Sequence, residues 1–326
     1  MANYHIYGVG NALVDIEYEV TTARLQELNI DKGLMTLIDE DRHHELLEHL
    51  SSLEGNKGSG GSAANTIIAA AQLGADTFYS CKVANDDTGT FYMQDLERCG
   101  VSSNLNMTNR EDGVTGKCLV MITPDADRTM NTFLGITSKI STAELDEAAL
   151  QQSEYVYIEG YLVPEPGARA AAVRAREVAT AANVKTALTL SDPNMVQFFK
   201  DGLMEIAGPG LDLCFCNEAE AKLMFDTDDL AGCVEGMKSL AKRFAITLGA
   251  KGALLYDGEN TLNIPALKVE AIDTNGAGDM YAGSFLFALT DGRSFEQAGE
   301  LAARTASTLV TRYGARMPTA DLQALL

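Results

Sequence analysis

The sequence predicts an α/β fold in which a mainly parallel central sheet carries helices on both faces. Two observations support this prediction. From about residue 136 onward, short apolar strand patterns alternate with helical patterns, and such alternation is typical of parallel sheets whose crossover helices cover both faces. The first 135 residues are rich in strand patterns and short polar turns instead, so we expect this part to be mainly β.

The β-rich part also contains one clear helix. Residues 6–9 form the apolar run of a buried strand, and residues 16–20 alternate apolar and acidic side chains, as a strand with one solvated face does. Residues 61–73 are apolar and rich in alanine and end before Gly74, which predicts a helix with a glycine cap. Further strands are expected at 116–123 and 129–134.

Strands and helices alternate in the rest of the chain. Ser141 and Glu144 have the spacing of a capping box and predict a helix start. The other expected elements are strands at 155–161, 185–190, 211–216, 244–248 and 252–256, and a helix at 168–182. Ligands of parallel sheets bind beyond the carboxyl ends of the strands. Polar residues fall at or just past these ends: Asn11, Asp192, Asn194, Asn217 and Thr247.

Composition narrows the choice of partners and compartment. The formal net charge of −21 disfavours a nucleic acid or an acidic membrane surface as a partner. The first residues have neither a charged leader nor a long apolar run, and no stretch has the length of a membrane span. The six cysteines show no disulfide or zinc spacing. We therefore expect a cytoplasmic protein with reduced cysteines.

The most informative segment is Asp273-Thr274-Asn275-Gly276-Ala277-Gly278-Asp279, which leads directly into an apolar helical pattern. A turn of small residues that opens a helix leaves backbone N–H groups free, and these groups and the helix dipole attract an anion. Asp279, at the helix start, is placed to accept a proton from a hydroxyl group. The segment therefore suits phosphoryl transfer to an alcohol, with a simple capped helix start as the alternative.

Five motifs, in the same order along the chain, resemble those of the ribokinase-like (PfkB) family of carbohydrate and nucleoside kinases. They are Gly8–Asp15, Gly58–Thr66, Asn217–Glu220, Thr247–Gly252 and Asp273–Asp279. The resemblance implies the ribokinase-like fold, with a small β-sheet lid beside the α/β core. In this fold residues 1–10, 41–103 and 136–326 would form the core that binds nucleotide and phosphate. Residues 11–40 and 104–135 would form the lid over the substrate.

Within the family, the chain looks most like bacterial adenosine kinases. The similarity lies in residues 10–15, 32–39 and 128–135 and in the exact sequence of residues 273–279. It implies transfer of the γ-phosphate of ATP to the 5′-hydroxyl of adenosine or a related nucleoside. A sugar kinase of the fructokinase or ribokinase type and a binding protein without turnover remain as alternatives. An aromatic side chain stacked on a base would favour a nucleoside, and the candidates are Tyr18, Phe133 and Tyr161.

The resemblance also implies roles at the reacting end of the site. Asp279 would be the general base, and the backbone amides of Gly276, Ala277 and Gly278 would form the anion hole. Arg128 would close over the γ-phosphate, because a guanidinium fork suits phosphate oxygens; a surface arginine is the alternative. The residues expected to bind the acceptor are Asn11, Asp15, Gly60, Gly61, Asn65 and Asn131, with a plain strand residue as the alternative for Asn131.

The remaining implied roles concern the nucleotide and the ions. The nucleotide residues would be Asn194, Asn217, Glu220, Thr247, Gly249 and Gly252. Glu220 would hold Mg²⁺ through water, although Asn217 and Glu220 also fit a plain helix cap. Asp273, Asn275 and Gly314 would form a site for an activating K⁺, with loop-stabilising hydrogen bonds as the alternative for Asp273. A monomer and a homodimer are both compatible with the sequence.

Overall fold

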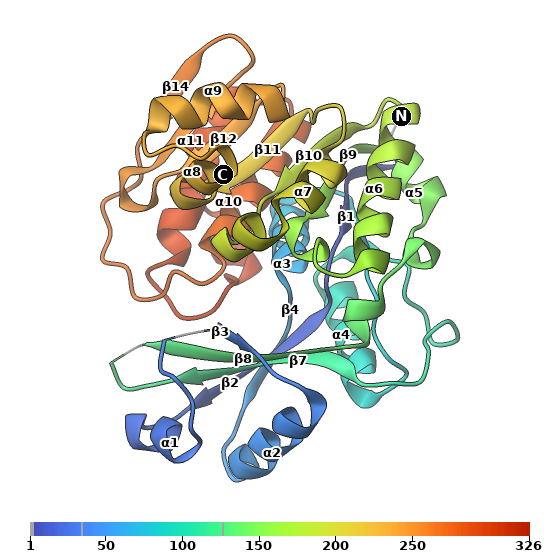
Figure 1. The fold of residues 1–326 in the computed structure, drawn as a ribbon, viewed down its shortest axis with the longest axis vertical. Helices are drawn as coiled ribbons and strands as arrows, with labels where there is room; N and C mark the ends of the chain where they lie inside the picture. Colours follow the sequence, from blue (N-terminus) through green and yellow to red (C-terminus); the bar gives the residue numbers. More distant parts are fainter. Residues whose placement is uncertain (1–2, 34, 126) are drawn as a thin grey trace.

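The computed structural model describes residues 3–33, 35–125 and 127–326, which form two sheets and the helices around them (Figure 1). Residues 1, 2, 34 and 126 lie outside the described residues, and residue 34 belongs to one of the motifs shared with adenosine kinases. In Figure 1 the larger sheet and most helices occupy the upper part, and the smaller sheet crosses below them.

The larger sheet has nine strands in the order β14-β13-β12-β11-β10-β9-β1-β5-β6. From β12 to β6 all neighbours are parallel, while β13 and β14 add an antiparallel edge, so the predicted mainly parallel sheet is confirmed. Its strands are β1 (Tyr4–Val9), β5 (Thr77–Ser80), β6 (Val101–Ser103), β9 (Ser153–Glu159), β10 (Lys185–Thr189), β11 (Leu213–Asn217), β12 (Phe244–Thr247), β13 (Ala253–Tyr256) and β14 (Thr261–Ile264).

Helices cover both faces of this sheet, as the β–α alternation predicts. One face carries α3 (Ser62–Leu73), α4 (Asp87–Arg98), α10 (Ala277–Thr290), α11 (Phe295–Leu309) and α12 (Thr319–Gln323). The other carries α5 (Glu147–Gln151), α6 (Pro166–Ala181), α7 (Pro193–Ala207), α8 (Glu218–Phe225) and α9 (Leu230–Leu240). Strand alternation supplies both cores, because Phe215 of β11 packs in the first and Cys216 in the second. Within the described ranges, no helix is long and apolar enough for a membrane crossing.

Short 3-10 turns replace two of the expected regular segments. The capping box of Ser141 and Glu144 is present, but it caps only the turn Thr142–Glu144, and α5 begins later. The strand expected to reach residue 161 ends at Glu159 and continues as the turn Gly160–Leu162. Two further turns span Ile136–Lys139 and Gly249–Lys251.

The smaller sheet has the order β3-β8-β7-β2-β4. Its strands are β2 (Leu13–Glu19), β3 (Met35–Leu37), β4 (Asn56–Gly60), β7 (Thr115–Ile122) and β8 (Arg128–Gly135). In Figure 1, α1 (Thr22–Glu27) and α2 (Glu40–Leu50) lie on the side away from the larger sheet. β4 comes from the range 41–103, which the sequence assigns to the core. It pairs with β2 from Leu13–Gly60 to Glu17–Asn56, and its residues Asn-Lys-Gly-Ser-Gly have no strand pattern that a sequence reading detects.

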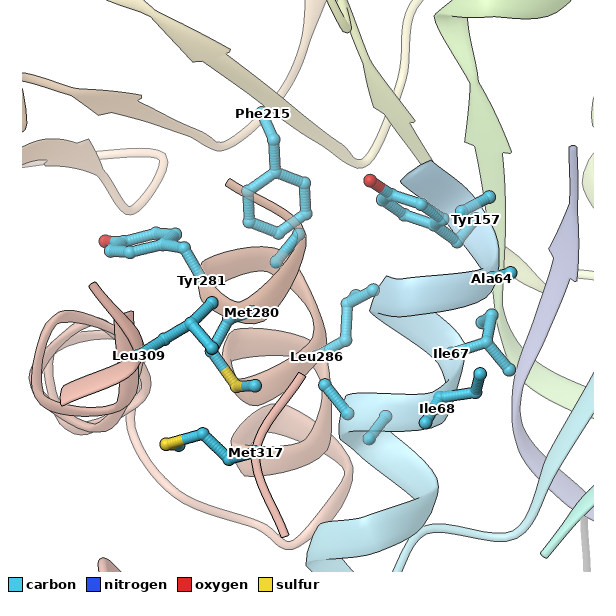
Figure 2. Close-up of a cluster of buried hydrophobic side chains, with 14 of the residues drawn as sticks. Ala64, Ile67, Ile68, Tyr157, Phe215, Met280, Tyr281, Leu286, Leu309 and Met317 are labelled. Carbon is cyan, nitrogen blue, oxygen red and sulfur yellow. The ribbon is translucent and has the colours of Figure 1, made fainter. Parts of the chain in front are cut away.

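The contact between α3 and α10 positions the residues at the starts of both helices. Figure 2 shows the two helices side by side with Leu286 between them. Gly283 lies at this contact, where a Cβ atom would overlap the Thr66 carbonyl oxygen and lie 2.9 Å from the Ala69 Cβ. The helices therefore approach this closely because residue 283 has no side chain.

Replacing Gly283 by alanine should lower the free energy of unfolding by about 1–3 kcal/mol, since the added methyl group overfills a packed contact. The control is Gly167→Ala in α6. A Cβ at residue 167 would lie 3.4 Å from the Ile140 carbonyl oxygen, which is an ordinary contact distance. We expect Gly167→Ala to be neutral or slightly stabilising. Urea unfolding followed by circular dichroism measures both, and equal midpoints for the two variants would contradict the packing argument.

Candidate active site

A pocket of about 500 Å³ lies between the two sheets. The smaller sheet contributes one wall through alternate residues of β2, β7 and β8. The opposite wall consists of the carboxyl ends of β9 to β12 and the first residues of α3 and α10. This is the expected position for a ligand on a parallel sheet. Among the sequence-predicted residues, the lining includes Asn11, Asp15, Gly61, Asn65, Asn217, Glu220, Thr247, Asn275, Gly276, Gly278 and Asp279.

Asp279 lies in the first turn of α10 and is held by two side chains of α3. Its Oδ1 accepts a hydrogen bond from the Ser62 hydroxyl at 2.7 Å, and its Oδ2 accepts one from the Asn65 side-chain amide at 3.3 Å. Burial raises the pKa of Asp279 to about 6, and the two hydrogen bonds oppose that shift because they favour the charged form. The result is a fixed carboxylate that is ionised at neutral pH and basic enough to accept a proton.

The turn before Asp279 opens α10 toward the pocket. Gly276 caps the helix with a φ of +73°, a conformation that glycine adopts readily, and its backbone lies close to Ala315. Gly276 and Gly278 line the pocket, and Ala277 is the first residue of the helix. Space beside Gly278 is open within 4 Å of its Cβ position. The Ala277 amide already donates to the Thr274 carbonyl oxygen at 3.2 Å. The amides of Gly276 and Gly278, both in the pocket lining, are therefore the ones that can face an anion at the start of this 14-residue helix.

A second group of polar residues lies where β2 and β4 meet α3. Burial raises the pKa of the Asp15 carboxyl to about 7, although the Arg316 guanidinium opposes the shift. Gly60 leaves room for this carboxylate, because a Cβ at residue 60 would overlap the Asp15 oxygens. The buried Asn65 Oδ1 has no hydrogen-bond partner among the described residues. Asp15 and Asn65 thus offer hydrogen-bond acceptors to hydroxyl groups of a ligand.

Glu159 is a pocket residue that is not among the candidates selected from the sequence. Its Oε2 accepts hydrogen bonds from the backbone amides of Ala63 and Asn11 at 3.0 and 3.2 Å, and its Oε1 accepts one from the Asn11 side chain at 3.1 Å. Burial raises its pKa to about 7. Glu159 ends an apolar strand, so the rule that selected Asn11 and Asn217 would also have selected it. Ser62, which follows the glycine pair, was likewise missed.

The nucleotide-side candidates gather at the ends of β11 and β12. Asn217 and Glu220 form a complete capping box on α8, with Oε2 of Glu220 accepting from the Asn217 backbone amide at 3.0 Å. Burial, and to a smaller extent the charge of Asp192, raise the pKa of Glu220 to about 7. Asp192 also lines the pocket. Two carboxylates facing one space fit Mg²⁺ held through water, so the helix cap and the magnesium role are compatible.

Asn131 does not line the pocket, contrary to the sequence expectation. Met130, Thr132 and Leu134 of β8 line it, and because side chains alternate along a strand, Asn131 and Phe133 face the other side. There the Phe133 ring stacks on His43 with 5.1 Å between centroids. The sequence does not distinguish the two faces because β8 is packed on both. Of the three candidate aromatics, the pocket lining includes Tyr161 alone.

Asn194, Gly249 and Gly252 also lie outside the pocket lining. Asn194 is in the first turn of α7, where its backbone amide donates to Asp192 Oδ1 at 2.7 Å, and Asp192 reaches the pocket instead. Gly249 and Gly252 shape the turn after β12, whose last residue, Thr247, lines the pocket. The nucleotide roles that the resemblance implies for these three residues therefore remain predictions.

Arg128 is buried and lies outside the pocket lining. Its Nη1 donates to Glu17 Oε1 at 3.1 Å, and its Nη2 lies 2.8 Å from Asp273 Oδ2. Asp273 also accepts from the backbone amide of Asn275 at 3.0 Å and from that of Gly314 at 2.9 Å. The structure thus brings the three expected cation-site residues together, with Arg128 beside them.

At the start of α10 the fold brings together an ionisable carboxylate and a turn with backbone amides. This combination is typical of a phosphotransferase with an alcohol group as acceptor. The family model for "pfkB family carbohydrate kinase" matches residues 30–321, and the chain belongs to this family. The chain is therefore a kinase that takes ATP as co-substrate. The ribokinase-like fold expected from the five motifs is confirmed.

Solved structures and curated relatives include kinases of two kinds. An adenosine kinase from Sinorhizobium meliloti has a TM-score of 0.89 and 34% identity, over 99% of this chain and 98% of that one. A probable sugar kinase from Rhizobium etli CFN 42 has a TM-score of 0.89 and 30% identity, over 99% and 98% of the two chains. Adenosine kinase from Saccharomyces cerevisiae is 26% identical over 333 residues, covering 95% of this chain and 96% of the relative.

Proposed function

We propose that the chain transfers the γ-phosphoryl group of ATP to the 5′-hydroxyl of adenosine or a related nucleoside. The observation that carries this proposal is the Asp279 carboxylate, buried at the pocket and held by Ser62 and Asn65 directly after the Gly276–Gly278 turn. A proton acceptor and an anion site thus share one helix start. Phosphoryl transfer depends chiefly on such positioning and charge stabilisation.

In the proposed reaction, an oxygen of Asp279 takes the proton of the attacking hydroxyl as the new O–P bond forms. The bond between the γ-phosphorus and the bridging oxygen of ATP breaks, and ADP leaves with that oxygen. Ser62 and Asn65 keep both carboxylate oxygens in place, so little reorganisation is required. The backbone amides of Gly276 and Gly278 face the charge on the phosphoryl oxygens. When bound with ATP, Mg²⁺ neutralises phosphate charge, and Asp192 and Glu220 are the side chains that would hold it through water.

The composition of the pocket supports a nucleoside as the acceptor. Asp15 and Asn65 offer acceptors for two vicinal hydroxyls of a ribose. The lid wall opposite is apolar, with Val120, Met130 and Leu134, and Tyr161 also lines the cavity. A flat apolar base fits such a wall better than a free sugar does. We also propose that the smaller sheet acts as a lid that excludes water during transfer.

A sugar kinase is the second candidate, and Glu159 favours it. This carboxylate lies in the pocket together with Asp15 and Asn11. Among the described residues, Oε1 of Glu159 accepts one hydrogen bond, from the Asn11 side chain, so this oxygen can accept another from a ligand hydroxyl. A polyol without a base would use that additional acceptor. The same base and anion site would serve either acceptor.

The first test is coupled ADP release with Mg-ATP across adenosine, inosine, guanosine, ribose, fructose and 2-keto-3-deoxygluconate. We expect turnover with a nucleoside, and a roughly 10²–10⁴-fold lower kcat in Asp279→Ala with ATP binding retained in calorimetry, because loss of the base affects the transition state. Asp291→Ala, at the other end of α10, is the control. Turnover of free sugars would support the second candidate, and normal turnover by Asp279→Ala would exclude this mechanism.

Asp15→Ala should raise KM for the acceptor by roughly 10- to 100-fold, because hydrogen bonds to a carboxylate contribute about 1.5–3 kcal/mol. It should also reduce the preference for the nucleoside over its 2′-deoxy and 3′-deoxy analogues. Glu19→Ala changes an exposed acid at the end of the same strand and should leave both quantities unchanged. Steady-state kinetics on the three acceptors measures the effect. An unaltered preference in Asp15→Ala would remove Asp15 from the sugar site.

The activity should also fall at low pH with a midpoint near 6, as Asp279 becomes protonated. Ser62→Ala removes a hydrogen bond that favours the charged carboxylate, so the pKa of Asp279 should rise and the acid limb of kcat/KM should move to higher pH. Ser239→Ala, which removes an exposed hydroxyl on α9, is the matched control. A Ser62→Ala profile that overlays the unmodified one would show that Asp279 does not set this limb.

A further inference from the structure

The residues expected to hold K⁺ do not fit a bound cation in this structure. Asp273 Oδ2 already accepts from the Gly314 amide and lies 2.8 Å from Arg128 Nη2, and Asp273 Oδ1 accepts from the Asn275 amide. The Arg128 and Asp273 side chains are only 7% and 4% exposed. The Asp273 carboxylate therefore has a buried, permanently charged partner of its own.

Arg128 takes the position beside Asp273 Oδ2 that a cation would otherwise occupy. Nη1 of Arg128 donates to Glu17 on β2, while Nη2 lies close to Asp273 as an ion pair without hydrogen-bond geometry. One guanidinium thus lies between two carboxylates from different parts of the fold. A K⁺ placed at Asp273 would have to displace the guanidinium or lie beside it. Both alternatives are costly where water is excluded, since like charges repel strongly there and a displaced buried cation loses its partner.

We propose that Arg128 supplies at Asp273 the positive charge that a monovalent cation would otherwise provide. The inference rests on the proposed function insofar as it concerns phosphoryl transfer, because Asp273 begins the segment that ends in the anion turn and Asp279. Arg128 is the first residue of β8, so this charge is a fixed part of the smaller sheet. Phosphoryl transfer by this chain then does not need K⁺.

The kinetic test compares initial rates in potassium chloride and in tetramethylammonium chloride at equal ionic strength, with Mg-ATP and the acceptor found active. We expect the two rates to differ by less than twofold. A larger activation by K⁺ would overturn the proposal, because it would show that the charge of Arg128 is not sufficient.

A melting test needs no substrate. Arg128→Gln leaves the buried Asp273 carboxylate without its cation, so the melting temperature should fall by several degrees in tetramethylammonium chloride. Potassium chloride should recover part of that loss in Arg128→Gln and should leave the unmodified protein unchanged. The proposal would be overturned if K⁺ raised the melting temperature of both proteins equally, or did not raise that of Arg128→Gln. Either result would show that Arg128 does not take the place of a cation at Asp273.

Two further variants make the melting test specific. Lys82→Gln breaks another poorly exposed ion pair, in which Lys82 lies 2.6 Å from Glu144. It should lose stability without any recovery by K⁺. Arg128→Lys keeps a positive charge near Asp273, so its melting temperature should not depend on K⁺. This variant replaces Arg128→Gln in the test if Arg128→Gln does not fold. A rise in the melting temperature of Arg128→Lys with K⁺ would count against the proposal. If no acceptor is turned over, the proposed function fails while the melting test still decides this inference.

Discussion

The burial of the Asp279 carboxylate between two helices is the constraint on which the rest of the site depends. Both of its oxygens are held by α3, through Ser62 and Asn65, although the carboxylate itself belongs to α10. Its position therefore depends on how closely α3 and α10 pack, and the absence of a side chain at Gly283 permits that approach. The hydrophobic contact in Figure 2 thus sets the geometry of a polar group at the end of the same helices.

The carboxylates of the pocket reduce folding stability at the pH where they are charged. Burial raises the pKa of Asp279 to about 6 and that of Asp15, Glu159 and Glu220 to about 7. Groups whose pKa is raised on folding contribute stability that is present at acidic pH, below their unfolded pKa, and lost as the pH rises through 6 and 7. The charged forms that the proposed base and acceptor site require are therefore the ones that lower folding stability. The two hydrophobic cores offset this cost.

Local sequence patterns predict most of the fold, because apolar periodicity and cap residues act over a few residues. β1, β9, β10 and α3 are predicted within a few residues of their ends. β4 is missed, since Asn-Lys-Gly-Ser-Gly becomes a strand only by pairing with β2. The turn Gly276–Asp279 is predicted because one helix start contains the whole feature. Which face of β8 meets the pocket, and which carboxylates Arg128 contacts, depend on residues distant along the chain, so no local pattern contains them.

The smaller sheet contributes more than a cover to the pocket. Asp15, a candidate acceptor ligand, lies on β2, and Arg128, which pairs with Asp273, begins β8. Asp273 is bonded in turn to the backbone of Asn275, one residue before Gly276. The buried ion pair of Arg128 and Asp273 thus connects the smaller sheet to the segment that leads into the turn Gly276–Gly278. We expect a shift of the smaller sheet to move this segment. In this arrangement residues of both sheets line the same pocket, so the candidate site depends on both.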